Sequence, residues 1–205
     1  MSEADPRVLS SYLSQTLRAL RAARAWSLDR AASETGVSKA MLGQIERGES
    51  SPTIATLWKI ATGFECSLSS FLAPPAGMAP ATLLRSASAL RGKPASDEML
   101  VAPLFPYDAT LGFEMLELTF APGYERRSEP HAAGVIEHVI VLRGALEVRI
   151  DGKWQALVEG DAVRFAADLA HGYRNVSARP AVCHNLICYP GRRPPPNKYP
   201  QPKSI

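Results

Sequence analysis

Small, polar and basic side chains share one face of a short helix predicted to follow Ser38. At about 100° per residue, these side chains are Lys39, Ala40, Gly43, Gln44 and Arg47. Gln44 can pair bidentately with adenine, Lys39 can reach guanine, and the Ala40 methyl group can pack on thymine in a major groove. The pattern therefore predicts a helix that reads base edges. An ordinary helical hairpin with a solvated face is the alternative that the spacing leaves open.

Two short helices joined by a tight turn must position this face. Ser27 and Ser38 each precede a helical run and are good N-cap residues. Gly36 stands where a helix ends and the backbone often needs a positive φ. The apolar residues that the second helix is expected to bury are Met41, Leu42 and Ile45. The residues predicted to bind the phosphate backbone are Ser27, Ser38, Arg47 and Thr53.

The helices around this hairpin give it a family likeness. The matching residues are Leu17, Leu20, Arg21, Ala31, Ala32, Gly36, Val37, Ser38, Leu42, Ile45, Glu46, Arg47, Gly48, Pro52, Thr53, Leu57, Lys59, Ile60 and Ala61. They resemble the five-helix DNA-binding domain of lambda-repressor-type (Xre family) regulators over residues 13–72. The resemblance implies that Arg21 pairs with Glu46 and ties the first helix to the reading helix. We expect the first helix to start at Ser10 or Ser11 and to run to about Ala25, and the fourth to end at Gly63.

Composition places limits on the class of protein. The chain has 205 residues, of which 46% are hydrophobic and 21% charged, as in an ordinary globular protein. It contains no apolar run long enough to span a membrane and no secretory signal at its start, so we expect a cytoplasmic protein without a membrane partner. Cys66, Cys183 and Cys188 fit no disulfide framework or zinc spacing. They are expected to be buried or half-buried thiols, with a redox-sensor role for Cys183 and Cys188 as the alternative.

The chain divides into a basic and an acidic part. Residues 10–73 carry a net charge of +2 and residues 97–189 a net charge of −5, which suits a DNA reader joined to a domain that does not touch DNA. We predict a DNA-binding domain at 10–73, a linker at 74–96, a second domain at 97–190 and a Pro-rich basic tail at 191–205. Within the linker, Leu83 and Leu84 start either a strand or a bridging arm. The tail is either disordered or in contact with DNA or a neighbouring subunit.

The second domain shows strand periodicity. From about Met99 apolar and polar residues alternate, and the clearest strands are predicted at 113–120, 139–143, 146–150, 163–165 and 182–189. Turn signals such as Pro122-Gly123 and Asp151-Gly152 fall between them. Many short strands with regular turns indicate an all-β sandwich or barrel.

Spaced histidines in this domain give a second family likeness. All four histidines, His131, His138, His171 and His184, lie in it. His131, Glu137 and Gly144 fall in register with the first motif of cupins, and Gly160, His171 and Asn175 with the second. Residues 99–190 thus resemble the sensor domain of Xre-cupin regulators. The resemblance implies a double-stranded jelly-roll barrel.

The cupin likeness implies a ligand site. Cupin enzymes hold iron, manganese, zinc or nickel with three histidines and a glutamate, and here Ala133 replaces one histidine. Ala166 and Asp168 also depart from the second motif. The resemblance leaves His131, Glu137 and His171 as possible ligands of a divalent metal such as Zn, Fe, Mn or Ni. The alternative is a metal-free pocket in which the same residues bind an organic effector.

Further residues are candidates for this site. Tyr173 and His184 are predicted to contact the effector, although the register leaves open whether His184 or Asn185 faces inward. His138 is expected to point away from Glu137 because successive residues of a strand face opposite sides. The arginines that either clamp a carboxylate or lie on the surface are Arg126, Arg127 and Arg164.

Together these features predict a one-component transcription regulator, expected to be a repressor and not an enzyme. Its partners would be a double-stranded DNA operator, a small-molecule or metal effector, and a second copy, because one recognition helix reads only a few base pairs. The effector would shift operator affinity by preferring one arrangement of the two reading heads. Two alternatives remain open. One is a metal-dependent cupin enzyme with a DNA-binding appendage, and the other is an antitoxin-like DNA binder whose cupin only dimerises.

Overall fold

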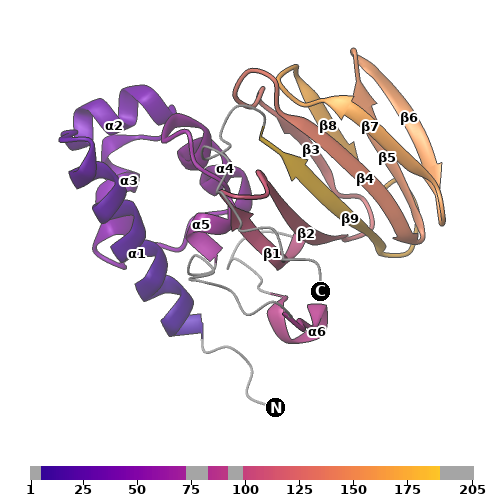
Figure 1. The fold of residues 1–205 in the computed structure, drawn as a ribbon, viewed down its shortest axis with the longest axis horizontal. Coiled ribbons are helices and arrows are strands. Elements are labelled where there is room, and N and C mark those ends of the chain that lie inside the picture. Colours follow the sequence, from indigo (N-terminus) through magenta and orange to yellow (C-terminus); the bar gives the residue numbers. More distant parts are fainter. Residues whose placement is uncertain (1–5, 73–82, 92–98, 190–205) are drawn as a thin grey trace, which may run out of the picture.

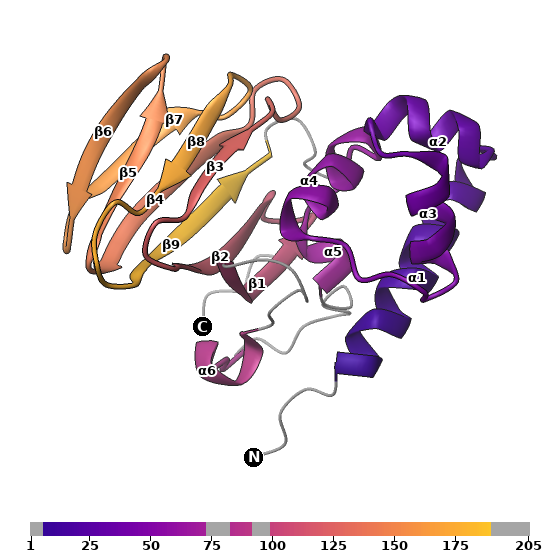
Figure 2. The ribbon, with the colours of Figure 1, turned by 180° about the vertical axis from the view of Figure 1, so that it is seen from behind.

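A computed structural model describes residues 6–72, 83–91 and 99–189 of the chain. Helices form one lobe and β-sheets form the other (Figure 1). The view from behind shows α4 and α5 on the side of the helical lobe that faces the strands, and α2 and α3 farther out (Figure 2). The predicted order of an all-α domain followed by an all-β domain is confirmed.

The helical lobe contains five helices among the described residues. They are α1 (Pro6–Ala23), α2 (Leu28–Thr35), α3 (Lys39–Glu46), α4 (Ile54–Gly63) and α5 (Ser69–Leu72). The side chains of Ser27, Ser38 and Thr53 each accept a hydrogen bond from the first turn of the following helix, which confirms the predicted caps. Gly36 ends α2 at φ 64°, a left-handed conformation that glycine adopts without strain.

Two local predictions in this lobe are wrong. Helix α1 begins at Pro6 rather than at Ser10 or Ser11 and ends at Ala23. Proline favours the first helical position because its φ is already helical and its missing N–H is not needed there. Met41 is 39% exposed, whereas Leu42 and Ile45 are fully buried. Met41 lies at the border of the buried stripe of α3, where the neighbouring helices do not cover it.

The strand lobe is a two-layer sandwich. Its first sheet has the order β1-β2-β9-β4-β7 and its second the order β3-β8-β5-β6. The strands are β1 (Met99–Asp108), β2 (Phe113–Phe120), β3 (Glu125–Ser128), β4 (Ile136–Arg143), β5 (Ala145–Ile150), β6 (Lys153–Val158), β7 (Ala162–Ala166), β8 (His171–Arg174) and β9 (Ala181–Cys188). The five strands predicted with bounds are all present within three residues at each end. This architecture confirms the predicted all-β sandwich.

The segment between the lobes differs from the predicted linker. Residues 83–86 form no strand, and Leu84 is 95% exposed, so the strand suggested for Leu83 and Leu84 is wrong. A short helix, α6 (Ala87–Leu90), follows and packs on β1. Arg91 Nε then donates a hydrogen bond to Glu117 Oε1 at 2.8 Å. The rest of the linker and the tail predicted at 191–205 lie outside the described residues, and the four domain bounds stay predictions.

Helix α5 is hydrogen-bonded to the strand lobe. Ser69 N donates to Glu114 Oε2 at 2.9 Å, and Tyr107 N donates to Ser69 Oγ at 2.8 Å. Glu114 also accepts a hydrogen bond from the hydroxyl of Tyr189. Glu114 is fully buried, and this desolvation raises the pKa of its carboxyl group. A buried, multiply hydrogen-bonded carboxyl group therefore joins the two lobes at α5.

Neither a membrane-spanning helix nor a disulfide is found among the described residues. Within the described ranges, none of the helices has the length and apolar character needed to cross a bilayer. All three cysteines are free thiols. Cys183 is fully buried on one face of β9 and Cys188 is half-buried five residues later, on the other face. Their side chains leave opposite sides of the strand, so the two thiols do not face each other, and the alternative of a redox-sensor role stays a prediction.

Candidate nucleic-acid interface and ligand site

The outward face of α3 carries three predicted base-reading side chains. Lys39, Ala40 and Gln44 are exposed. Lys39 Nζ forms an ion pair with Asp29 Oδ2 at 2.8 Å, in which both side chains are more than half exposed. Exposed pairs of this kind contribute only about 0–1 kcal/mol. Lys39 can therefore exchange Asp29 for a base edge or a phosphate at small cost.

Gly43 and Arg47 were predicted to share this face of α3. Their surroundings differ from those of the other three residues predicted there. Gly43 is buried, and a Cβ at its position would stand 3.1 Å from the guanidinium of Arg47 and 3.8 Å from Leu28. The structure thus does not present Gly43 to a DNA base, because the Arg47 side chain covers it. Arg47 is exposed and makes two hydrogen bonds to Glu49, at 2.7 and 2.8 Å. Ser27, Ser38 and Thr53 stand at the N-termini of α2, α3 and α4.

A bidentate ion pair holds α3 against α1. Arg21 Nε donates to Glu46 Oε1 at 2.6 Å, and Arg21 Nη2 donates to Glu46 Oε2 at 2.8 Å. Arg21 Nη1 donates to the carbonyl of Trp26 at 2.9 Å. The Arg21–Glu46 pair implied by the family likeness is confirmed. It fixes the C-terminal end of the predicted reading helix.

The strand lobe brings His131, Glu137 and His171 together between its two sheets. One potential ligand atom of each lies within 4.8 Å of the others. His131 comes from the loop after β3, Glu137 from β4 in the first sheet and His171 from β8 in the second. His131 Nε2 lies 2.8 Å and His171 Nε2 lies 3.5 Å from the same oxygen, Glu137 Oε1. A single carboxylate oxygen therefore faces both imidazoles.

Glu137 is kept ionised in this interior. Its side chain is 1% exposed. Burial alone would raise its pKa, but the hydrogen bonds from His131 and Tyr173 and the electrostatic interactions with the two imidazoles outweigh burial and lower it to about 2. Its second oxygen, Oε2, accepts hydrogen bonds from the hydroxyl of Tyr173 and, at 2.9 Å, from Asn185 Nδ2. The carboxylate is thus oriented through Oε2, which leaves Oε1 facing the two imidazoles.

Neighbouring groups also determine which atoms of His171 and Tyr173 carry a proton. His171 Nδ1 lies 2.9 Å from the carbonyl of Leu169, and donation to that carbonyl leaves Nε2 as the lone-pair nitrogen. Burial lowers the pKa of His171 and favours its neutral form. Burial and the charge of Glu137 raise the pKa of Tyr173 well above its ordinary value. Tyr173 therefore stays protonated and keeps donating to Glu137.

The structure settles which residues of β9 face inward. Asn185 bonds Glu137. His184 therefore lies on the opposite face of β9, so the structure does not bring it to the site, and its prediction as an effector contact is wrong. The sequence could not decide this point because it depends on one residue of register. The same alternation puts His138 on the face of β4 opposite Glu137, as predicted.

The three arginines considered as a carboxylate clamp are placed differently. Arg127 and Arg164 are exposed. Arg126 lies on β3, and its guanidinium carbon lies 5.3 Å from the ring centroid of Trp58, a residue of α4. The same Trp58 ring lies 4.7 Å, centroid to centroid, from the imidazole of His131. Sequence reasoning missed this residue, because an apolar side chain at helical spacing gives the same signal whether it fills a core or covers a site.

These residues fit a divalent metal ion. Two imidazole nitrogens and one carboxylate oxygen suit zinc, iron, manganese or nickel. The hydrogen bond from His171 to Leu169 and those from Tyr173 and Asn185 to Glu137 are the supporting contacts that such ligands need. Asn185 Oδ1 adds a buried acceptor that has no hydrogen-bond partner among the described residues. A fourth polar group is thus available beside Glu137 for a metal, a water or a ligand.

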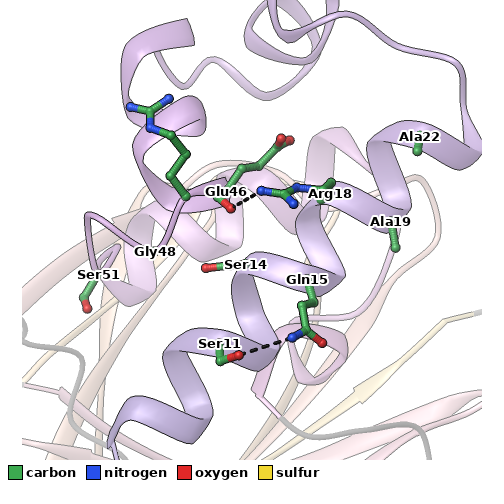
Figure 3. Close-up of a pocket in the computed structure, with 10 residues that line it drawn as sticks. Ser11, Ser14, Gln15, Arg18, Ala19, Ala22, Glu46, Gly48 and Ser51 are labelled. Atoms are coloured by element: carbon green, nitrogen blue, oxygen red, sulfur yellow. Dashed lines mark hydrogen bonds between the residues drawn. The ribbon is translucent and has the colours of Figure 1, made fainter.

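A groove lies elsewhere, between α1 and the end of α3 (Figure 3). Its volume is about 890 Å³. Ser14 Oγ donates to the carbonyl of Ile45 at 2.7 Å and Arg18 Nη2 to that of Glu46 at 2.8 Å. The figure shows small side chains such as Ala19 and Ala22 along the α1 side of the groove. The polar groups named here are bonded within the domain, and we assign the groove no ligand.

Comparison with known proteins identifies the family. Residues 17–71 match the helix-turn-helix family and residues 116–187 match the cupin domain family. The HTH-type transcriptional regulator SutR of Escherichia coli (strain K12) is 50% identical over 182 residues, which are 89% of this chain and 97% of the relative. The chain belongs to the helix-turn-helix transcriptional regulators that carry a C-terminal cupin domain. Both family likenesses seen in the sequence are confirmed.

The solved structure of a whole regulator agrees with this membership. An HTH_3 family transcriptional regulator from Vibrio cholerae is 45% identical, with a TM-score of 0.77, and the match covers 90% of this chain and 98% of that one. The cupin domain of an XRE family regulator from Enterobacter cloacae is 52% identical over 46% of this chain and 99% of that one, with a TM-score of 0.45. The fold and the family together make this chain a transcriptional regulator that binds DNA. The α2–α3 hairpin is therefore its helix-turn-helix, and the alternative of an ordinary helical hairpin is set aside.

Proposed function

We propose that this regulator represses transcription by binding an operator through α3. The observation that carries the proposal is the division of α3 into two faces. Leu42 and Ile45 are fully buried and lock the helix in the domain, while Lys39, Ala40 and Gln44 remain exposed. Those three would contact base edges. Repression is the expected mode because occupation of a promoter needs DNA binding alone.

The N-termini of three helices support contacts to the phosphate backbone. Ser27, Ser38 and Thr53 cap α2, α3 and α4, and helix N-termini favour anions because free N–H groups and the helix dipole point there. Each cap hydroxyl accepts one hydrogen bond from its own helix and can donate its proton to a phosphate. Arg47 would add a charged contact by exchanging Glu49 for a phosphate. These four residues would set the register of α3 on the duplex.

The cluster in the second domain is proposed as the effector site. It would hold a divalent cation on His131, Glu137 and His171, with Tyr173 and Asn185 orienting the carboxylate. The support is the spacing of the three ligand atoms and the orientation of Glu137 Oε1 toward both imidazoles. A bound cation would supply a Lewis-acidic point at which an anionic or chelating small molecule can bind.

The metal content of untagged protein, purified without chelator, tests this site. We expect about one equivalent of metal by mass spectrometry in the wild type and a loss of that metal in His171→Ala. Absence of metal from both proteins, with no uptake of added Zn²⁺, would refute the cation. The same residues would then be tested as a metal-free pocket for organic effectors.

A second copy of the chain is proposed as the partner. A palindromic operator presents two half-sites about 34 Å apart, or a multiple of that distance, and so needs two reading helices. Three large apolar side chains on one face of β4 support a contact through the strand lobe: Ile136, Ile140 and Leu142 are 36%, 40% and 38% exposed. Light scattering should give twice the chain mass for the wild type and the mass of one chain for Ile140→Asp. The control variant Val158→Asp should also give twice the chain mass. An unchanged mass of Ile140→Asp would exclude this face.

We infer that the protein is a regulator and not an enzyme, which the name of its 50% identical relative supports. Operator binding is tested by selecting duplexes from a random library with the full chain and measuring their fluorescence anisotropy against a scrambled duplex. Selection of a recurrent, two-fold symmetric sequence is the expected result. Equal affinity for the selected and scrambled duplexes would refute sequence-specific regulation. Metal-dependent turnover of a small molecule would instead favour the enzyme alternative.

A further inference from the structure

The wall of the proposed effector site includes a residue of the DNA-binding domain. Trp58 lies on α4 and is 9% exposed. Its indole ring lies on His131 at a centroid distance of 4.7 Å and an interplanar angle of 32°. The guanidinium carbon of Arg126 lies 5.3 Å from the same ring. One side chain of the reading lobe thus contacts a proposed ligand and a basic neighbour of the strand lobe.

Helix α4 is built rigidly into the reading lobe. Gly63, in its last turn, packs so closely on α2 that a Cβ there would lie 2.6 Å from the carbonyl oxygen of Glu34 and 2.7 Å from the Cα of Thr35. Ile60 of α4 is fully buried. Because α2 continues through a tight turn into α3, a displacement of α4 moves the whole base-reading unit. Close-packed interiors transmit such displacements rather than absorb them.

The three proposed ligands differ in how well they are placed for an ion. Ligand atoms about 2.0–2.2 Å from a tetrahedral ion stand roughly 3.4 Å from one another. His171 Nε2 already lies 3.5 Å from Glu137 Oε1. His131 Nε2 lies only 2.8 Å from that oxygen, in a hydrogen bond. An ion must therefore separate His131 from Glu137, and His131 is the ligand in contact with Trp58.

The second connection between the lobes is independent of this cluster. It joins Ser69 of α5 to Glu114 and Tyr107 through buried and half-buried hydrogen bonds. Those bonds involve none of the three proposed ligands. They can therefore hold the lobes together as a pivot while the contact at α4 changes.

We propose that Trp58 is the positioning residue through which a cation on His131, Glu137 and His171 changes the affinity of the reading lobe for DNA. The proposal rests on the effector site described under the proposed function. Cation binding moves His131 away from Glu137, and the indole of Trp58 follows the imidazole of His131. Because Trp58 belongs to α4, the movement displaces α4 together with α2 and α3. The two lobes then differ in relative placement between the free and the bound protein, which alters how two reading helices of a dimer fit two half-sites.

Two readouts on the full chain test this role, with Zn²⁺ alone as the probe. The first is the emission of Trp58 in a Trp26→Phe, Trp154→Phe background, where it is the remaining tryptophan. Zn²⁺ has a filled d shell, so a spectral change reports the surroundings of the ring. We expect a saturable shift that is absent when His171→Ala is added. A Zn²⁺-loaded protein with unchanged emission would overturn the proposal.

The second readout is the ratio of operator affinities at saturating Zn²⁺ and without it. Energetic coupling between sites typically changes affinity by roughly 5–150-fold. We expect such a ratio in the wild type and in the control Trp154→Ala, which alters a ring stacked on Arg174. Trp58→Ala should bring the ratio to about one, and Trp58→Phe should keep part of it. Trp58→Phe retains an aromatic ring in the interface, which guards against simple misfolding.

The possible outcomes distinguish the proposed effector site from the proposed role of Trp58. A wild-type ratio that persists in Trp58→Ala overturns the role of Trp58 and leaves the effector site standing. A wild type that binds no Zn²⁺ overturns the effector site and the role of Trp58 with it. By reciprocity, operator DNA must change the affinity for Zn²⁺ by the same factor in the wild type. A Trp58→Ala protein in which DNA still changes that affinity would also contradict the proposal.

Discussion

Arg21 and Glu46 form a two-point ion pair that joins α1 to the last turn of α3, with hydrogen bonds of 2.6 and 2.8 Å. Glu46 is 8% and Arg21 is 23% exposed. The pair fixes the last turn of α3 through a buried carboxylate. The orientation of the predicted reading helix thus depends on a contact made within the helical lobe.

Loss of this pair should destabilise the helical lobe. Arg21→Ala leaves the buried carboxylate of Glu46 without its donors, and we expect a loss on the order of 1–3 kcal/mol in the free energy of unfolding. Arg30→Ala is the control, because Arg30 makes a largely exposed pair with Glu34 on α2, and such pairs contribute little. Denaturant unfolding measures both. Equal, small effects of the two variants would show that the pair does not hold α3.

Gln44 should carry sequence information. Gln44→Ala should weaken binding to the operator by about 1–3 kcal/mol and leave binding to random DNA nearly unchanged, because it removes a base contact and no charge. Gln155→Ala makes the same chemical change on β6 and should alter neither. Fluorescence anisotropy on both duplexes gives the comparison. Equal losses on the two duplexes would mean that Gln44 only positions the helix.

Tyr173 should tune the affinity for a cation through Glu137. Its hydroxyl donates to Glu137 Oε2, and loss of a hydrogen bond that orients a ligand typically costs about 10–100-fold in metal affinity. We expect a decrease of that size for Zn²⁺ in Tyr173→Phe, measured by competition with a chromophoric chelator. Tyr12→Phe loses one hydroxyl bond in the helical lobe and serves as the control. A wild-type affinity in Tyr173→Phe would contradict the assigned role of Glu137.

Glu114 should make the stability of the protein depend on pH. Burial raises its pKa above the ordinary value of 4.5, so the folded state favours the protonated form. The corresponding stability is fully present below about pH 4.5 and is lost as the pH rises through the raised pKa. Glu114→Gln cannot ionise, and its unfolding free energy should therefore fall less over that range. Denaturant unfolding at a series of pH values tests this, with the exposed Glu159→Gln as control. Parallel curves for Glu114→Gln and the wild type would contradict it.

Local signals predicted the hairpin and most strands. Ser27, Ser38 and Gly36 act within one turn of the chain, so their capping roles followed from residue type and spacing. The start of α1 was misplaced because Ser10 and Ser11 gave stronger cap signals than the earlier Pro6. The strands β3, β6 and β8 were not predicted, and β1 was predicted only as an alternation that starts at about Met99. The segments β3 and β8 have four residues each, too few for a clear alternation.

Long-range arrangement could be predicted only in part. The cupin likeness predicted that His131, Glu137 and His171 meet, and the structure brings them together. The choice of Asn185 over His184 depended on pairing between strands, which no local pattern encodes. The contact of Trp58 with His131 joins two domains and follows only from how they pack. Sequence reasoning was therefore weakest at the interface that we propose transmits the effector signal.

A ligand at His131, Glu137 and His171 is proposed to control DNA binding. This proposal is tested most directly by the operator dissociation constant of the full chain, measured with and without saturating Zn²⁺, for the wild type beside His171→Ala. We predict a change of roughly 5-fold or more in the wild type and none in His171→Ala. A wild type that binds Zn²⁺ and DNA but shows the same dissociation constant in both conditions would contradict the account.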